Sequence, residues 1–372
     1  MCHRHPIHCI IPPHMLDEIT KSGTDSQREK AEETMAISNR IRIQRTSRDL
    51  TARMAAIPVT AQKQRNVYDA KNGSQLPGTL VRTEGDPPSS DVAVNEAYDG
   101  SGVTYDLFKD IYGRNSIDNK GMPLDSTVHY LQGYDNAFWN GKQMVYGDGD
   151  EDLPPAQRLF NRFTAALDVI GHELTHGVTQ FEANLVYSQQ PGALNESMSD
   201  VFGSLVKQRL RGQLTNEADW IVGEGLFTSN VNGVGIRSMK APGTAYNDPV
   251  LGKDPQPAHM RDYVNTIQDN GGVHINSGIP NHAFYLASME MGGFAWEKMG
   301  MVWYKTLTDK LSRNSNFQDA ANYTFTTAGE LFGQNSLEQM AVRKGWEDVG
   351  ITVGAPPQEG CFNAALRAVG LR

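Results

Sequence analysis

Hydrophobic residues change their spacing several times along the chain, and each change predicts a different kind of structure. Residues 1–16 contain three prolines, which predicts an extended arm. The next stretch, 25–48, is strongly charged and free of glycine, while Ala31, Met35 and Ile37 follow a helical spacing. The amino-terminal part is therefore predicted to be an extended arm followed by one or two helices.

After this stretch the pattern becomes typical of a sheet. Short apolar runs at 79–82 and 127–131 are separated by clusters of Gly, Asp, Asn and Pro, which predicts twisted antiparallel strands. One helix is expected among them, over 94–112. Residues 136–140, followed by 143–148, predict an edge strand and a turn.

The second half of the chain is predicted to be mainly helical. A long helix over 160–178 is expected to lie between the two halves of the protein. Further helices are predicted at 196–210, 279–291, 296–311, 317–332 and 336–349.

Composition and charge limit the possible functions. The 372 residues are enough for two domains with substantial cores. A formal charge of −9 argues against nucleic acid or an anionic membrane as a partner. The charge is uneven, because residues 1–65 carry +4 and the remainder −13, which suggests that a basic arm docks on an acidic body.

No apolar run reaches the roughly 18 residues of a membrane span. The first residues also lack the apolar centre of a signal peptide. We therefore expect a protein without a membrane span that is either secreted by a non-standard route or cytoplasmic.

The strongest chemical pattern is His172-Glu173-Leu174-Thr175-His176. On a helix the two histidines lie one turn apart on one face, so both can bind one metal ion, and the motif is a known zinc pattern of metalloproteases. Glu173 would stand beside the metal as the base that acts on water. Glu196, at the start of a second helix, is expected as the third ligand, with Asp200 hydrogen-bonded to a ligand histidine.

The alternative interpretation of this motif is an amphipathic helix with two solvated or capping histidines. The downstream run from Asn195 to Asp200 makes that alternative the weaker one. Longer zinc motifs carry a third histidine six residues after the second, but Glu182 occupies that position here. The third ligand is therefore expected to be a glutamate.

Three motifs together resemble the thermolysin family of zinc endopeptidases: HELTH at 172–176, GALNE at 192–196 and DNGGVHINSG at 269–278. The similarity covers about residues 60–352, and Ile10-Ile11-Pro12-Pro13 resembles the protealysin-like branch. The resemblance implies an α+β fold of two domains, β-rich and then mainly α-helical, with the active-site helix at the cleft between them. It divides the chain into a prosegment (1–55), an N-terminal catalytic domain (56–186), a C-terminal catalytic domain (187–353) and a tail of unknown role (354–372).

The same resemblance implies a neutral zinc endopeptidase, made as a self-processing precursor, that cuts before bulky hydrophobic residues. Tyr187 and His274 match the family's oxyanion donors, and Asp269 would orient His274. Arg237 matches the arginine that binds the substrate carbonyl beyond the cut. The substrate strand would bind at Asn136 and the Ala137 backbone, and its apolar side chain would enter a pocket formed by Phe160, Phe163, Val169, Val222, Leu226 and Ile236.

Extracellular relatives hold a double calcium site, and this chain departs from it. Asp168, Asp219 and Glu224 match part of the site, but Lys207 and Ile221 replace two acidic ligands. We expect the Lys207 ammonium to supply the missing charge and to pair with Asp168 or Asp219. Zinc is then the one catalytic ion, and calcium binding is weak or absent.

The expected partners are protein and peptide substrates and the chain's own prosegment, which would inhibit a monomeric enzyme until a cut within about 48–58. Leu50, Met54 and Ile57 are candidates to follow that cut. Three cysteines do not form a disulfide framework. Cys2 and Cys9 are candidate zinc ligands in the precursor, and they are interleaved with four histidines: His3, His5, His8 and His14. The default interpretation is free thiols beside a chance cluster of histidines. Cys361 lies in the tail.

Other functions remain open at this point. The amino-terminal arm could be a regulatory segment that is never removed. The protein could be a latent relative that binds peptides or a partner while the prosegment stays in the cleft. A zinc aminopeptidase is a third possibility, although no acidic anchor for a free amino terminus is evident in the sequence.

Overall fold

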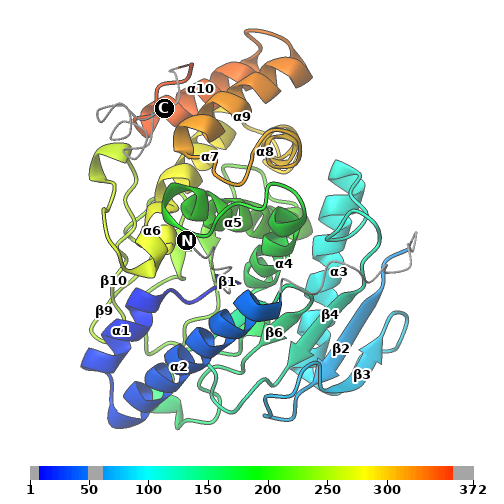
Figure 1. Cartoon of the computed structure of the whole chain (residues 1–372), viewed down its shortest axis with the longest axis vertical. Helices are drawn as coiled ribbons and strands as arrows, with labels where there is room; N and C mark the ends of the chain where they lie inside the picture. The colour runs from blue at the N-terminus through cyan, green and yellow to red at the C-terminus, as the bar shows by residue number, and fades with distance from the viewer. Residues whose placement is uncertain (1–7, 49–61, 355–372) are drawn as a thin grey trace.

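The computed structural model describes residues 8–48 and 62–354, with side chains for 9–38 and 62–354. A six-stranded sheet in the order β1-β5-β6-β4-β2-β3 forms one half of the molecule, and helices form the other (Figure 1). The strands of this sheet are β1 (His8–Cys9), β2 (Arg65–Asp69), β3 (Thr79–Thr83), β4 (Leu124–Val128), β5 (Ala137–Trp139) and β6 (Met144–Tyr146). The expected α+β architecture is confirmed.

The expectation of a purely antiparallel sheet is wrong. Strand β4 runs parallel to both β2 and β6, whereas β5 is antiparallel to β6. Helix α3 (Val92–Tyr112) lies in the connection that returns the chain to a parallel position. Local residue patterns give the period of a strand but not its direction, and they also placed β4 three residues too late.

The helices of the amino-terminal segment are α1 (Pro13–Ser22) and α2 (Asp25–Arg48). The extended arm predicted through residue 16 therefore ends earlier, at Pro12. A proline fits at the first helical position because its fixed φ is helical and its missing N–H has no partner there. Met15, Leu16 and Ile19 of α1 are buried against the body.

The two central helices are α4 (Leu167–Phe181) and α5 (Gln189–Arg211). Helix α4 begins later than predicted, because Phe160 forms a bridge with Phe227 and 163–165 is a single 3₁₀ turn. The two helices approach closely at Gly203, where an added Cβ would lie 2.4 Å from the Asp168 carbonyl oxygen. This contact brings the side chains of α5 within reach of those of α4.

The remaining elements complete the carboxyl-terminal half. Short strands form two pairs, β7 (Ile221–Val222) with β8 (Arg237–Ser238) and β9 (Asn247–Asp248) with β10 (Gly252–Lys253). The helices are α6 (Asp269–Asn276), α7 (Gly278–Met291), α8 (Lys298–Asp309), α9 (Phe317–Phe332) and α10 (Leu337–Asp348).

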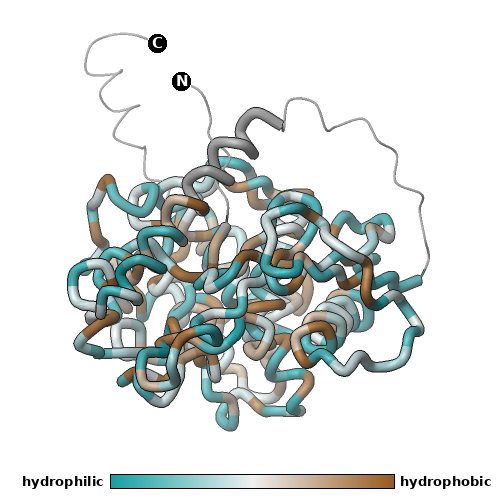
Figure 2. Tube along the Cα trace, turned by 90° about the horizontal axis from the view of Figure 1, so that it is seen from below, coloured by the Kyte–Doolittle hydropathy of each residue, from teal (hydrophilic) through white to brown (hydrophobic). Residues whose placement is uncertain are grey.

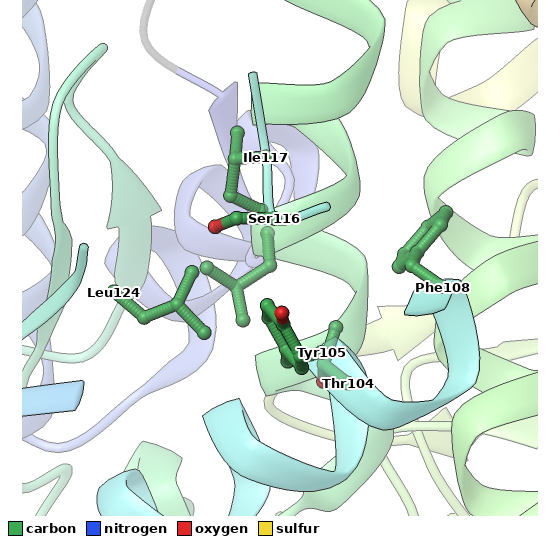
Figure 3. A pocket seen from close by; sticks show the side chains of 7 residues that line it. Thr104, Tyr105, Phe108, Ser116, Ile117 and Leu124 are labelled. Carbon is green, nitrogen blue, oxygen red and sulfur yellow. The ribbon is translucent and has the colours of Figure 1, made fainter. Parts of the chain in front are cut away.

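One large apolar core joins the prosegment, the sheet and the central helices, while hydrophilic stretches are prominent in the outer loops (Figure 2). A void of about 10 Å³ lies beside α4, and the hydroxyl groups of its three hydroxyl-bearing residues already donate to carbonyl oxygens. It is a packing void lined by Thr104, Tyr105, Phe108, Ser116, Ile117, Leu124 and Leu174 (Figure 3). Among the described helices, none combines the length and apolar character needed to span a membrane.

Candidate active site

The two histidines of α4 point their Nε2 atoms at each other, 2.9 Å apart, in a fully buried position. Asp200 Oδ1 lies 2.8 Å from Nδ1 of His172, and Asn195 Oδ1 lies 2.8 Å from Nδ1 of His176. Both oxygens are acceptors, so each Nδ1 carries the proton and each Nε2 presents a lone pair. Two lone pairs do not bond to each other, and a cation between them fits this arrangement.

Glu196 of α5 completes this group. Its Oε2 is 3.5 Å from Nε2 of His172, and its Oε1 is 3.5 Å from Nε2 of His176. The buried Oε2 has no hydrogen-bond donor, which is costly for a carboxylate unless a cation is present. The residues therefore fit a zinc ion with a His₂Glu ligand set.

Glu173 has a different environment, although its carboxylate and the ring nitrogens of His172 and His176 lie within 4.8 Å of one another. Its Oε2 accepts a hydrogen bond from the Trp139 backbone N–H at 3.0 Å, which ties the carboxylate to β5. Burial, and then the nearby Glu196 charge, raise the pKa of Glu173 well above its usual value. We assign the third ligand position to Glu196, because its two oxygens bracket both imidazoles, and this leaves Glu173 beside the metal.

Asp200 links the zinc helix to Arg237. Its two oxygens accept hydrogen bonds from the guanidinium at 2.8 Å each, and Asn281 Nδ2 donates to Oδ2 at 2.8 Å. Burial alone would raise the pKa of Asp200, but Arg237 and His172 outweigh it and lower that pKa. Asp200 therefore stays ionised and fixes both neighbours.

Tyr187 and His274 both lie near the Oε1 atom of Glu196. The Tyr187 hydroxyl donates to Glu196 Oε1 and lies 3.0 Å from His274 Nε2. Asp269 holds His274 through Nδ1 at 2.6 Å and through the backbone N–H at 2.8 Å. Burial would lower the pKa of His274, but the Asp269 and Glu196 carboxylates raise it overall, which favours an imidazolium that donates hydrogen bonds.

The predicted substrate strand position is occupied by the prosegment. Strand β1 pairs antiparallel with β5, and Ile10 N–H donates to the Ala137 carbonyl at 3.3 Å. Asn136 Oδ1 accepts a hydrogen bond from Ile11 N–H at 3.0 Å. Ile10 is fully buried in the apolar core that also contains all six predicted pocket residues: Phe160, Phe163, Val169, Val222, Leu226 and Ile236.

The region of the expected calcium site contains a lysine ammonium. Lys207 Nζ is 2.9 Å from Asp168 Oδ2, 2.9 Å from Asp219 Oδ1 and 3.6 Å from Glu224 Oε2, and it donates to the Ile221 carbonyl at 2.7 Å. Burial would lower the pKa of Lys207, but Asp168 and Asp219 reverse that effect and raise it. The ammonium is therefore charged in this acidic cluster.

The candidate thiol ligands have separate outcomes. Cys9 is buried in a cluster with Tyr130, Tyr134, Phe138 and Val145 and is not part of the His172–Glu173–His176 group. His14 lies in α1, with its Nε2 3.2 Å from the Tyr246 hydroxyl. The other candidate positions lie outside the residues whose side chains are described: Cys2, His3, His5, His8, Cys361, Leu50, Met54 and Ile57.

The sequence interpretation missed several supporting groups. Asn281 and the Trp139 N–H contact the site from distant elements, and Ser199 Oγ lies 3.0 Å from His176 Nδ1. Ser199 and Asn195 could have been found, because they lie one turn apart around Glu196 on the same helix. No local signal identifies the other two.

Comparisons with known proteins agree with this geometry. A family model described as "Thermolysin metallopeptidase, catalytic domain" matches residues 27–180, and one described as "Thermolysin metallopeptidase, alpha-helical domain" matches 183–351. The chain is 51% identical to an extracellular metalloprotease of Pectobacterium carotovorum subsp. carotovorum, over 94% of this chain and 97% of that protein. It is 40% identical to a thermolysin of Alicyclobacillus acidocaldarius subsp. acidocaldarius, over 76% of this chain and 50% of that protein.

A solved structure gives a similar result. The precursor of protealysin, a metalloproteinase from Serratia proteamaculans, superposes with a TM-score of 0.82 at 50% sequence identity. The match covers 93% of this chain and all of that one. It therefore includes prosegment as well as catalytic body.

Proposed function

This chain belongs to the thermolysin family of metallopeptidases, and we propose that His172, His176 and Glu196 hold its catalytic zinc ion. The protein is a neutral zinc metalloendopeptidase in its precursor form. The observation that supports the ligand set is that the two oxygens of Glu196 lie 3.5 Å each from the facing Nε2 atoms of His172 and His176. Zinc bound there would polarise the substrate carbonyl and lower the pKa of a water molecule.

The residues around the ion then divide the work of amide hydrolysis. Glu173 takes the proton from water and passes it to the leaving amine. Tyr187 and His274 donate hydrogen bonds to the carbonyl oxygen as it gains negative charge. Asp269 keeps His274 in the required orientation, and Asp200 does the same for His172 and Arg237.

Substrate binds as an added strand along β5, where Asn136 and the Ala137 carbonyl contact its backbone. The six-residue apolar pocket accepts the side chain after the scissile bond and gives a preference for bulky hydrophobic residues there. The support is that residues 10 and 11 use the same hydrogen-bonding groups and that the Ile10 side chain is fully buried.

The prosegment (1–55) acts as an intramolecular inhibitor until it is cut away within about 48–58. One face of α2 docks on the loop that follows β6: Gln27 Nε2 donates to the Gln157 carbonyl at 2.8 Å, and Lys30 forms an ion pair with Asp152. Further along the same face, Thr34 Oγ1 accepts a hydrogen bond from the Asp135 N–H at 3.3 Å. This docking lets β1 compete with substrate for the edge of β5.

Calcium binding is weak or absent, because the Lys207 ammonium already lies among Asp168, Asp219 and Glu224, and Arg211 pairs with the latter two. We also propose that the enzyme is an extracellular monomer that binds protein and peptide substrates and no nucleic acid. The name of the Pectobacterium relative supports the location.

Casein cleavage by the purified, zinc-loaded chain tests the function. Glu173→Gln is expected to lower the rate of casein cleavage at least about 100-fold while zinc stays bound. Glu196→Gln is expected to lower the zinc content measured by elemental analysis. Glu330→Gln, at an exposed pair with Lys310, is the matched control and should change neither. Peptide binding without any cleavage would instead favour the latent, peptide-binding protein, a function supported by the occupied cleft.

A further inference from the structure

The segment around Cys9 and Ile10 lies along β5 as an extended peptide. His8 is paired with Trp139 and Cys9 with Phe138. The next two backbone N–H groups donate to the Ala137 carbonyl and to Asn136 Oδ1. The prosegment therefore crosses the active site in the form that a substrate would take.

The Cys9 carbonyl lies at the reacting centre. Its oxygen is 3.1 Å from His274 Nε2, and that nitrogen is 3.0 Å from the Tyr187 hydroxyl and 3.6 Å from Glu196 Oε1. An oxyanion donor must contact the carbonyl of the bond that is cut. Among the described contacts of β1, the Cys9 carbonyl is the one that meets this condition.

Ile10 has the features of the residue after a scissile bond. Its carbonyl oxygen accepts a hydrogen bond from Arg237 Nη1 at 3.3 Å, and its side chain is fully buried. The order of the contacts along the chain, His274 first and Arg237 second, is the order for a substrate. A reversed strand would place the Arg237 contact before the His274 contact.

We infer that the active site hydrolyses the Cys9–Ile10 bond of its own prosegment, in addition to the processing cut within 48–58. This inference rests on the proposed function. One water is consumed, the amide C–N bond breaks, Cys9 gains a carboxyl group, and the Ile10 nitrogen takes a proton to become an amine. The products are residues 1–9 and a chain that begins at Ile10.

The cut would open the cleft in two stages. In the described part of 1–9, the contacts with the body come from the short β1 strand and its Cys9 side chain. Residues from Ile10 onward stay attached through α1 and α2, whose Met15, Leu16 and Ile19 are buried. Loss of residues 1–9 would therefore clear the half of the cleft before the scissile bond, while the half beyond it stays covered.

Mass spectrometry of the zinc-loaded full chain over time tests this inference. We expect loss of nine residues and a new amino terminus at Ile10, with a first-order rate constant that does not change over a 100-fold dilution. The reaction should be absent in Glu173→Gln. Ile10→Leu should keep the cut, and Ile10→Asn should slow it at least tenfold relative to Lys21→Gln, an exposed control in α1.

A peptide identical to residues 4–14 provides a test that does not depend on docking of the whole prosegment. The mature enzyme should cut it between Cys9 and Ile10. If a sample that cleaves casein produces neither the 1–9 fragment nor the cut of this peptide, the inference is overturned and the proposed function is left intact. A rate proportional to protein concentration would also overturn it, whereas absence of all proteolysis would count against the proposed function itself.

Discussion

Replacing Lys207 by methionine removes the cation from the acidic cluster beside the zinc helix and keeps the length of the side chain. Lys207 and Asp168 are almost completely buried, with side-chain exposures of 3% and 1%, so water cannot compensate for the lost partner. Breaking such a buried pair costs about 3–5 kcal/mol of unfolding free energy. The Glu224 contact, at 3.6 Å and 41% exposed, contributes little because solvent screens it.

This loss should be visible as a fall in the thermal unfolding midpoint. At about 2–3 °C per kcal/mol for a protein of this size, Lys207→Met should unfold roughly 6–15 °C below the parent. Arg211 still pairs with Asp219 and Glu224, but the buried Asp168 loses its Lys207 partner, and these carboxylates offer the oxygen ligands that calcium prefers. Calcium at about 100 times its dissociation constant would return about 2.7 kcal/mol, so most of the loss should be reversed.

The assay is a thermal scan of zinc-loaded parent and variant, each with added calcium or magnesium and without a chelator. Lys344→Met is the matched control, because Lys344 and Asp348 form an exposed pair four residues apart on α10 whose loss should not shift the midpoint measurably. The reasoning is refuted if Lys207→Met unfolds within 2 °C of the parent. It is also refuted if calcium stabilises the parent as much as the variant.

Three further substitutions test other parts of the structure. Tyr187→Phe removes one oxyanion donor and should lower kcat for a peptide substrate about 10²- to 10³-fold, with little change in KM. An unchanged kcat would exclude the assigned role. Burial lowers the pKa of His14 from 6.5 to about 4, so docking of α1 should be stable above pH 6.5 and should weaken about 30-fold at pH 5. Hydrogen exchange of α1, measured in a Glu173→Gln background, should show this weakening. His14→Leu should remove the pH dependence. Ion pairs with Asp148 and Asp91 raise the pKa of His129 to about 9, so the stability they contribute is complete below pH 6.5 and is lost as the pH rises through 9. His129→Gln should therefore lower the free energy of urea unfolding by about 1–2 kcal/mol at pH 6 and by much less at pH 10. Equal losses at the two pH values would contradict the assignment.

The sequence by itself determined the features that depend on neighbours within a few turns. The spacing of His172 and His176 places both on one face of any helix. Helix α9 was predicted at its observed bounds, 317–332, and it begins with a local capping box between Asn316 and Asp319. The family resemblance extended this local information to the two-domain fold and the enzyme class.

Only the tertiary structure decided which distant groups meet at the site. The Trp139 N–H that holds Glu173, the Asn281 amide that holds Asp200 and the Cys9 carbonyl beside His274 come from segments 34, 81 and 265 residues away from their partners. Neither periodicity nor composition records such contacts, because strand direction and helix packing depend on how the whole apolar core closes. For the same physical reason, the sequence predicted a prosegment, but the contact between the Cys9 carbonyl and His274 is visible only in the folded chain.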